Sequence, residues 1–388
     1  MNKKVILNAK IAAFKEMTQP STIWIEDGQI QKIDAHVPPS ISDDYEVIDA
    51  NGHLLIPGMI DVHIHGANGH DMMDGTEESI MEVSRTCALT GCTSFLVTSV
   101  TSSIDDLMRL IHNVKQVIGK EPGAKIAGIH LEGPYLNVKR KGMQNEKYLR
   151  HPNIEEMKAI LTEAGSLIKM VTIAPELPGG LEMVQFLKER GIIVSLAHSD
   201  ATYEEAKQAF ATGASHVTHC FNGMRPIHHR DPGIVVAAFE DPQVSLQAIV
   251  DNIHLHPAVV RLMHRIKGAE GMVLITDALQ AMYMGDGEYE FGGHQVTVSN
   301  GEARLADGTL ASSTVTMNEA LRKTVESGIP LTDAVYMAST TPANILGLHK
   351  KGKIQEQTDA DLVLIDTDYQ VEWTMIGGKL YSDKKQTV

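Results

Sequence analysis

Short apolar segments of strand-like composition alternate with amphipathic segments of helical length along most of the chain. Several helical segments, such as 76–91, 153–165 and 202–213, begin at a capping residue and end at glycine. The strand-like segments are 58–64, 93–99, 125–131, 168–174, 192–198, 214–220, 244–250 and 272–278. This alternation is typical of βα units, and eight parallel strands close a (β/α)8 barrel. We therefore predict an α/β fold built on a TIM-like barrel. An open doubly wound sheet is the alternative, but no GxGxxG turn follows the first strand.

The two ends of the chain have a different character. Residues 1–56 and 360–381 consist of short alternating runs separated by turn residues. Two such segments that flank a barrel pair most simply with each other. We therefore expect one small β-sandwich domain made of residues 1–56 plus 355–388. The barrel then spans 57–354, and the stretch 283–310 predicts a β-hairpin insert after the eighth strand.

Polar side chains gather where the predicted strands end. These residues are His63, His65, Glu132, Glu176, His198, His219, Asp251 and Asp277. The active sites of (β/α)8 barrels lie at this carboxyl-terminal face. Imidazole and carboxylate groups are ligands that divalent transition metals accept, and a catalytic site keeps a position open for water. We predict a metal site here, with Asp277 as the group that moves a proton from water to a leaving nitrogen.

The composition argues against several other classes of protein. The net charge of −15 is unlike that of a nucleic-acid binder, which presents a basic face. No apolar run reaches the ~18 residues of a membrane helix. Cys87, Cys92 and Cys220 are too few and too irregularly spaced for a disulfide framework, and we interpret them as small buried side chains. Lys10 and Lys15 interrupt any signal-like segment at the N-terminus, so a cytoplasmic location is expected.

Several motifs together resemble one enzyme family. The segment PGMIDVHIHG, residues 57–66, is similar to the opening signature of the amidohydrolase superfamily. It is followed by HLEGPYLNVKRKG, LAHSDAT, THCFNGM, DPG and TDA, in the order found in the N-acetylglucosamine-6-phosphate deacetylases of that superfamily. The resemblance spans nearly the whole chain. It implies a barrel with a small β domain from both chain ends, a divalent metal, and hydrolysis of the acetamide of a phosphorylated amino sugar.

The resemblance also implies roles for individual residues. Glu132, His198 and His219 match the main metal ligands, and His63 and His65 match a pair that completes a second metal site in some members. Asp277 matches the catalytic acid and base. The positions that match the substrate-binding region are Met143, Gln144, Asn222, Gly223, Arg230, Asp251, His254, Leu310, Ala311 and Ser312. The family implies one or two divalent ions per subunit, and imidazole and carboxylate ligands suit zinc, iron, manganese or cobalt. It also implies a homodimer in which the arginine and histidine that hold the phosphate can come from the neighbouring subunit.

Three positions depart from the family pattern. Gln144 in KGMQ stands where some members have histidine, and an amide can donate a hydrogen bond but cannot carry a proton. Ser312 in LASS and Asn252 in DNIH each stand where glycine is frequent. Deacetylation of the galactosamine epimer, a cyclic-amide hydrolase and a non-catalytic interaction module are the alternatives. The hydantoinase kind of cyclic-amide hydrolase uses a modified lysine as bridging ligand, whereas this chain offers Glu132.

Overall fold

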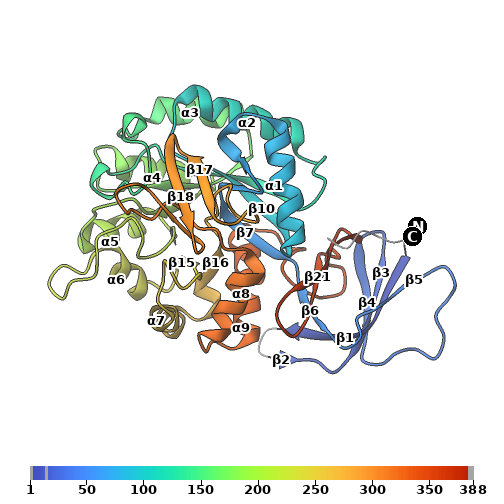
Figure 1. Cartoon of the computed structure of the whole chain (residues 1–388). Coiled ribbons are helices and arrows are strands. Elements are labelled where there is room, and N and C mark those ends of the chain that lie inside the picture. Colours follow the sequence, from blue (N-terminus) through green and yellow to red (C-terminus); the bar gives the residue numbers. More distant parts are fainter. Residues whose placement is uncertain (1–2, 14–15, 383–388) are drawn as a thin grey trace.

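The computed structural model describes residues 3–13 and 16–382, and its centre is a barrel of eight parallel strands (Figure 1). Neighbouring strands pair in the order β7, β10, β11, β12, β13, β14, β15, β16. Their bounds are β7 (Met59–Ile64), β10 (Cys92–Ser99), β11 (Lys125–Glu132), β12 (Ile168–Ile173), β13 (Ile193–Leu196), β14 (His216–Val217), β15 (Ser245–Ile249) and β16 (Met272–Ile275). The predicted fold class is confirmed.

The first and last strands meet along the closing seam of the barrel. The backbone N–H of Asp277 donates to His63 O (2.8 Å), and that of His65 donates to Ala278 O (2.9 Å). The buried carboxylate of Asp61 accepts hydrogen bonds from both strands, including the backbone N–H of His63 (3.1 Å). The seam therefore places the predicted catalytic aspartate directly beside the two histidines of the first strand.

Helices follow the strands and cover the outside of the barrel (Figure 1). Local capping sets where they begin: the Thr76 hydroxyl accepts from the N–H of Ser79, and Thr202 and Glu205 form a capping box. Their apolar faces pack on the strands and form one continuous buried core. The helices are α1 (Glu77–Leu89), α2 (Ile104–Val117), α3 (Ile154–Ala164), α4 (Gly180–Lys188), α5 (Tyr203–Thr212), α6 (Gly233–Glu240), α7 (Pro257–Lys267), α8 (Met317–Glu326), α9 (Leu331–Ala338) and α10 (Thr340–Ile345).

Three predicted strands end earlier than the sequence suggests, each just before a polar side chain of the barrel mouth. We expected strands through residues 198, 220 and 278, but β13, β14 and β16 end at Leu196, Val217 and Ile275. The reason is backbone conformation. His198, His219 and Asp277 have φ values of +46°, +30° and +48°, in the left-handed region that ends a strand. The turn aims each of these side chains into the mouth of the barrel.

Strands from both chain ends form a separate β domain beside the barrel (Figure 1). The strand β1 joins its two halves: residues near the start of β1 pair with β3 and β5, whereas Lys10 and Ile11 pair with β6. The strands are β1 (Lys3–Ala13), β2 (Glu16–Met17), β3 (Ser21–Glu26), β4 (Gln29–Asp34), β5 (Glu46–Asp49), β6 (Leu54–Pro57), β20 (Leu362–Ile365), β21 (Val371–Ile376) and β22 (Lys379–Tyr381). The exact domain boundaries given above stay a prediction.

The insert after the last barrel strand contains one strand more than a hairpin. β17 (Gly287–Phe291), β18 (His294–Ser299) and β19 (Glu302–Arg304) form a three-stranded antiparallel sheet. Its buried face carries Phe291, Val296 and Val298, which pack with Met143 and Leu279 of the barrel mouth. A further pair of short strands, β8 (Gly66–Ala67) and β9 (His70–Asp71), follows the first barrel strand. Within the described residues, no helix is both long and apolar enough to cross a membrane.

The three cysteines are buried and free, as the sequence predicts. Burial raises the pKa of Cys220 to about 12, and a hydrogen bond to Cys87 together with burial raises the pKa of Cys92. Because the thiolate is the reactive form, we expect the native protein to release less than ~0.1 equivalent of chromophore with Ellman's reagent in an hour. All three thiols should react after unfolding in guanidinium. Rapid labelling of the native chain would contradict this burial.

Candidate active site

A cavity of about 200 Å³ opens at the carboxyl ends of the barrel strands. Most of its lining comes from residues that end strands or lie in the loops after them, and the loop after the three-stranded insert closes one side. The lining residues are His65, Glu132, Gly142, Met143, Gln144, His198, His219, Asn222, Gly223, His254, Asp277, Thr309, Leu310 and Ser312. Most of the predicted site residues therefore converge on one cavity.

Glu132, His198 and His219 form the first polar group in this cavity. Glu132 Oε1 lies 2.9 Å from His219 Nε2 and 3.2 Å from His198 Nε2, and these two nitrogen atoms are 3.1 Å apart. All three side chains are buried. Ligand atoms of the three lie within 4.8 Å of one another, which is compatible with one shared ion.

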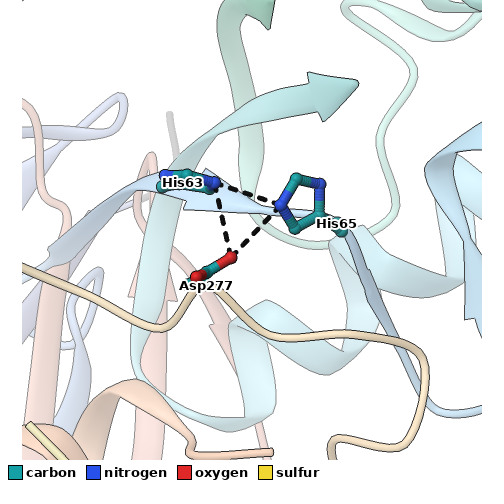
Figure 2. A group of neighbouring side chains, drawn as sticks. All are labelled: His63, His65 and Asp277. Carbon is teal, nitrogen blue, oxygen red and sulfur yellow. Dashed lines mark hydrogen bonds and ion pairs between the residues drawn. The ribbon is translucent and has the colours of Figure 1, made fainter. Parts of the chain in front are cut away.

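His63, His65 and Asp277 form the second group (Figure 2). The two Nε2 atoms are 3.0 Å apart, and Asp277 Oδ1 lies 3.4 Å from His63 Nε2 and 3.2 Å from His65 Nε2. Glu132 joins the two groups, because its Oε1 is 3.6 Å from His63 Nε2 and its Oε2 is 3.6 Å from His65 Nε2. Both groups are thus parts of one polar centre.

The hydrogen bond at Nδ1 fixes the orientation and the tautomer of each of the four histidine rings. Every Nδ1 faces an oxygen that can only accept: His198 faces Arg140 O (2.9 Å), His219 faces Asn222 O (3.1 Å), His65 faces Thr98 O (3.3 Å) and His63 faces Gln247 Oε1 (2.9 Å). Nδ1 must therefore carry the hydrogen atom. In the neutral ring, each Nε2 then directs its lone pair into the polar centre. This arrangement orients metal-binding imidazoles in proteins.

The electrostatics of the centre favour a positive charge. Burial alone would raise the pKa of Asp277, but the charge of His63 and the hydrogen bond and charge of His65 lower it to about 2. Burial opposes protonation of His65, yet the hydrogen bond to Asp277 and the charge of Glu132 raise the pKa of His65 to about 9. Burial lowers the pKa of His63 to about 4. The raised pKa of His65 shows that Glu132 and Asp277 together favour a positive charge beside them. A divalent transition metal can supply that charge in place of the proton, and nitrogen and oxygen donors of this kind fit such an ion.

Gln144 is held in one orientation at the edge of this centre. Its Oε1 accepts from the backbone N–H of Thr101 (2.8 Å), which can only donate. The amide nitrogen therefore faces Glu132, and Nε2 donates to Glu132 Oε2 (2.6 Å). One N–H of the amide remains beyond this bond, and Gln144 lines the cavity. The residue at this position thus presents a neutral donor.

The predicted substrate-binding residues divide into those that line the cavity and those that do not. Met143, Gln144, Asn222, Gly223, His254, Leu310 and Ser312 line it. Ala311 is buried behind the lining, and Arg230 is exposed with its guanidinium beside His229. Position 223 requires glycine for steric reasons, because a Cβ there would lie 2.8 Å from His198 Nδ1. The contacts of all these residues with a substrate stay predictions.

Asp251 lies behind His254 rather than in the cavity wall. Its Oδ2 accepts from His254 Nδ1 (2.6 Å), and its Oδ1 accepts from the backbone N–H groups of Ile253 and His254 (2.8 Å each). Burial works against ionisation, but these bonds and the neighbouring His254 lower the pKa of Asp251. Asn252 has a φ of +66°, which asparagine adopts more readily than most residues, and this explains its occurrence where glycine is frequent. The Asp251 carboxylate leaves Nε2 of His254 as the atom directed outward.

Sequence reasoning missed Gln247 and two parts of the cavity wall. Gln247 lies on β15, and its Oε1 accepts from the backbone N–H of His219 (3.3 Å) as well as contacting His63. It therefore connects the two polar groups. A single buried amide within the apolar segment VSLQAIV was the available signal. Gly142 and Thr309 also line the cavity, but they carry no distinguishing chemistry in the sequence.

Comparison with known proteins agrees with this geometry. Residues 54–381 match the pattern of the Amidohydrolase family. The chain belongs to this family. It is 37% identical over 378 residues to an N-acetylglucosamine-6-phosphate deacetylase of Lysinibacillus sphaericus, covering 97% of each chain. It is 34% identical over 362 residues to an N-acetylgalactosamine-6-phosphate deacetylase of Escherichia coli O157:H7, covering 92% of this chain and 96% of the relative.

The solved structures of this amidohydrolase family include one with a sugar phosphate bound. A variant of N-acetyl-D-glucosamine-6-phosphate deacetylase from Mycobacterium smegmatis, in complex with N-acetyl-D-glucosamine-6-phosphate, has a TM-score of 0.90 to this chain at 32% identity. The match covers 98% of this chain and 99% of the other. The barrel and the β domain are therefore shared with a deacetylase over essentially the whole fold.

Proposed function

We propose that this amidohydrolase removes the acetyl group of N-acetyl-D-glucosamine 6-phosphate, releasing acetate and D-glucosamine 6-phosphate. The observation that carries the proposal is the buried polar centre, in which Asp277 lies beside a carboxylate and imidazoles that fit a divalent metal. The near full-length similarity to deacetylases of this sugar phosphate supports the choice of substrate.

Glu132, His198 and His219 would hold the ion that activates the reaction, and His63 and His65 would hold a second ion together with Asp277. A divalent ion in such a site lowers the pKa of water to about 7 and polarises a carbonyl. The donor set suits zinc, iron, manganese or cobalt, with one or two ions per subunit. The His63 ring is kept in place for this role by Gln247, and the His198 ring by the carbonyl of Arg140.

Asp277 carries the proton in the proposed reaction. Its Oδ1 is engaged by His63 and His65, and Oδ2 accepts no hydrogen bond from the residues that the structure describes. Oδ2 is therefore free to take the proton of the attacking water and to return it to the amine nitrogen as the C–N bond breaks. Gln144 would supply a neutral donor for the acyl oxygen through the amide N–H that is not bonded to Glu132, since this residue lines the cavity.

Substrate binding would use the outer part of the cavity. Nε2 of His254 suits a phosphate oxygen because Nδ1 is occupied by Asp251. Arg230 lies on the exposed loop outside the lining, so we propose that it reaches the phosphate of a neighbouring subunit in a homodimer. Asn222, Gly223 and the loop of Leu310, Ala311 and Ser312 would contact the sugar. A cytoplasmic location completes the proposal.

The galactosamine epimer is the second candidate substrate. The similarity to an N-acetylgalactosamine-6-phosphate deacetylase favours testing it, since that relative also matches nearly the whole chain. The two sugars differ only in the orientation of one hydroxyl group, and discrimination would depend on a polar partner for that group. A cyclic-amide substrate is the remaining alternative.

Acetate release by the purified protein tests the proposal. We expect rapid release from N-acetylglucosamine 6-phosphate with divalent metal, and loss of activity after chelation followed by recovery on metal addition. The same assay with the galactosamine epimer should give a kcat/KM at least about tenfold lower. A hydantoin serves as the cyclic-amide control. Absence of acetate release with zinc, iron, manganese and cobalt alike would refute the proposed function.

A further inference from the structure

Ser312 has a backbone conformation that favours glycine. Its φ is +66°, in the left-handed region where a Cβ atom is disfavoured. The residue is only 8% exposed, and it forms part of the cavity wall. Strained residues of this kind persist where the surrounding structure determines their conformation, and they occur preferentially at functional sites. The position therefore raises the question of what its side chain contributes.

The hydroxyl of Ser312 contacts the proposed catalytic carboxylate. Oγ donates to Asp277 Oδ1 at 3.1 Å. Asp277 Oδ1 also lies 3.2 Å from His65 Nε2 and 3.4 Å from His63 Nε2. Oδ1 thus has three polar neighbours, two from the first barrel strand and its end and one from the loop after the three-stranded insert. Among the described residues none hydrogen-bonds to Asp277 Oδ2. The three contacts of Oδ1 therefore fix the orientation of the carboxylate and leave Oδ2 on the opposite side.

Backbone hydrogen bonds hold Ser312 and Asp277 in register. The N–H of Ser313 donates to Asp277 O (2.9 Å), and the N–H of Leu279 donates to Ser313 O (3.0 Å). On the other side, the N–H of Ala311 donates to Ala303 O in the three-stranded insert (3.0 Å). Both neighbours of Ser312 are therefore tied down. Its hydroxyl is placed against Asp277 by the backbone and does not depend on a flexible loop.

We propose that Ser312 is a positioning residue for Asp277. Its hydroxyl holds Oδ1 against the first barrel strand, so that Oδ2 points to the reacting water and the leaving nitrogen. This inference rests on the proposed function, in which Asp277 carries the proton. Glycine at position 312 would relieve the backbone strain but leave the carboxylate free to rotate. Serine at this position thus lowers the stability of the fold slightly and fixes the orientation of the Asp277 carboxylate.

Two substitutions at position 312 distinguish the effect of the hydroxyl from the effect of the backbone strain. Ser312→Ala removes the hydroxyl and keeps the strained Cβ, whereas Ser312→Gly removes both. We expect both variants to lower kcat about tenfold with KM changed less than about twofold, as for loss of a hydrogen bond to a charged group. Ser312→Gly should also raise Tm by about 1 °C.

Gln357→Gly is the matched control. Gln357 is exposed in the β domain and has a φ of +69°, so glycine there relieves similar strain far from the cavity. It should raise Tm by a similar amount, about 1 °C, and leave kcat unchanged. A purely structural role for Ser312 predicts that Ser312→Gly behaves in the same way. Parental kcat in an active Ser312→Gly enzyme would therefore overturn the proposal.

Crystal structures of the parent protein and both Ser312 variants provide a readout that does not depend on turnover. We expect the Asp277 carboxylate to occupy one orientation in the parent and to rotate or split in both variants. If the parent releases no acetate, the proposed function fails, and the carboxylate orientation alone then decides the role of Ser312. An unchanged carboxylate in Ser312→Gly would in that case refute the inference.

Discussion

Replacing Asp277 with asparagine is expected to lower kcat for acetate release by about 10²–10⁴-fold, with little change in KM. An amide is nearly the same size as the carboxylate but cannot accept a proton from water. Asparagine also tolerates the φ of +48° at this position, so the local backbone should be preserved. Initial rates over a range of substrate concentrations would separate kcat from KM.

Metal content distinguishes loss of the proton carrier from loss of the site. Asp277→Asn leaves Glu132, His198 and His219 intact, so elemental analysis should still find about one ion per chain. Asp333→Asn is a suitable control, because Asp333 pairs with His264 (2.9 Å) on the helical surface outside the cavity. That variant should retain parental kcat. Activity within tenfold of the parent in metal-loaded Asp277→Asn would remove this residue from the proposed mechanism.

The barrel could be predicted because its signal is local. Each of the eight strands is a short apolar run, and each is separated from the next by a segment with helical periodicity. Capping residues such as Thr76 and Thr202 mark helix starts within one residue. The extra strand of the insert was missed because β19 has only three residues, Glu302–Arg304, and this is too short for a periodic pattern.

Strand ends at the barrel mouth were predicted less well, for a reason connected with the site itself. An apolar run such as VLITDA continues to Asp277, but the structure leaves extended conformation after Ile275. Positive φ at a non-glycine residue has no strong signature in the sequence. The same holds for Ser312. The backbone conformations that aim side chains into the cavity are therefore visible only in the structure.

The contacts that orient the polar residues could not be predicted either, because they join distant parts of the chain. Gln247 and His63 are 184 residues apart in sequence, and Thr101 and Gln144 are 43 residues apart. A single sequence identifies a histidine as a candidate but does not show which acceptor faces its Nδ1. The structure supplies this information, and with it the direction of each Nε2 lone pair.

Glu132 is the residue whose replacement should have the largest effect on metal binding. Its carboxylate faces both polar groups and is only 2% exposed. Burial opposes its ionisation, but His63, His198 and His219 hold the pKa of Glu132 well below its usual range. The carboxylate therefore remains charged at neutral pH, and it supplies one of the two negative charges that attract a cation to the centre.

We expect Glu132→Gln to reduce bound metal from about one or two ions per chain to below ~0.2, and to abolish acetate release. The metal-dependent part of thermal stability should disappear as well. Ligand binding at 100–1,000 times Kd stabilises a protein by about 3–4 kcal/mol, so the parent should lose roughly 3–8 °C in Tm on chelation, whereas the variant should not respond.

The metal-free variant distinguishes a lost ligand from a damaged fold. Glu132→Gln keeps the shape of the side chain, so the variant should retain a native circular-dichroism spectrum and a cooperative thermal transition. Its Tm should lie below that of the chelated parent, because His65 and His219 lose the carboxylate that favours their charged forms. Glu176→Gln is the matched control, because Glu176 also follows a barrel strand but accepts hydrogen bonds from Ser199 (2.6 Å) and Asn137 (2.8 Å) instead of facing the histidines. That control should retain metal. Full metal occupancy in Glu132→Gln would show that the ion is held without this carboxylate, and would move the primary site to His63, His65 and Asp277.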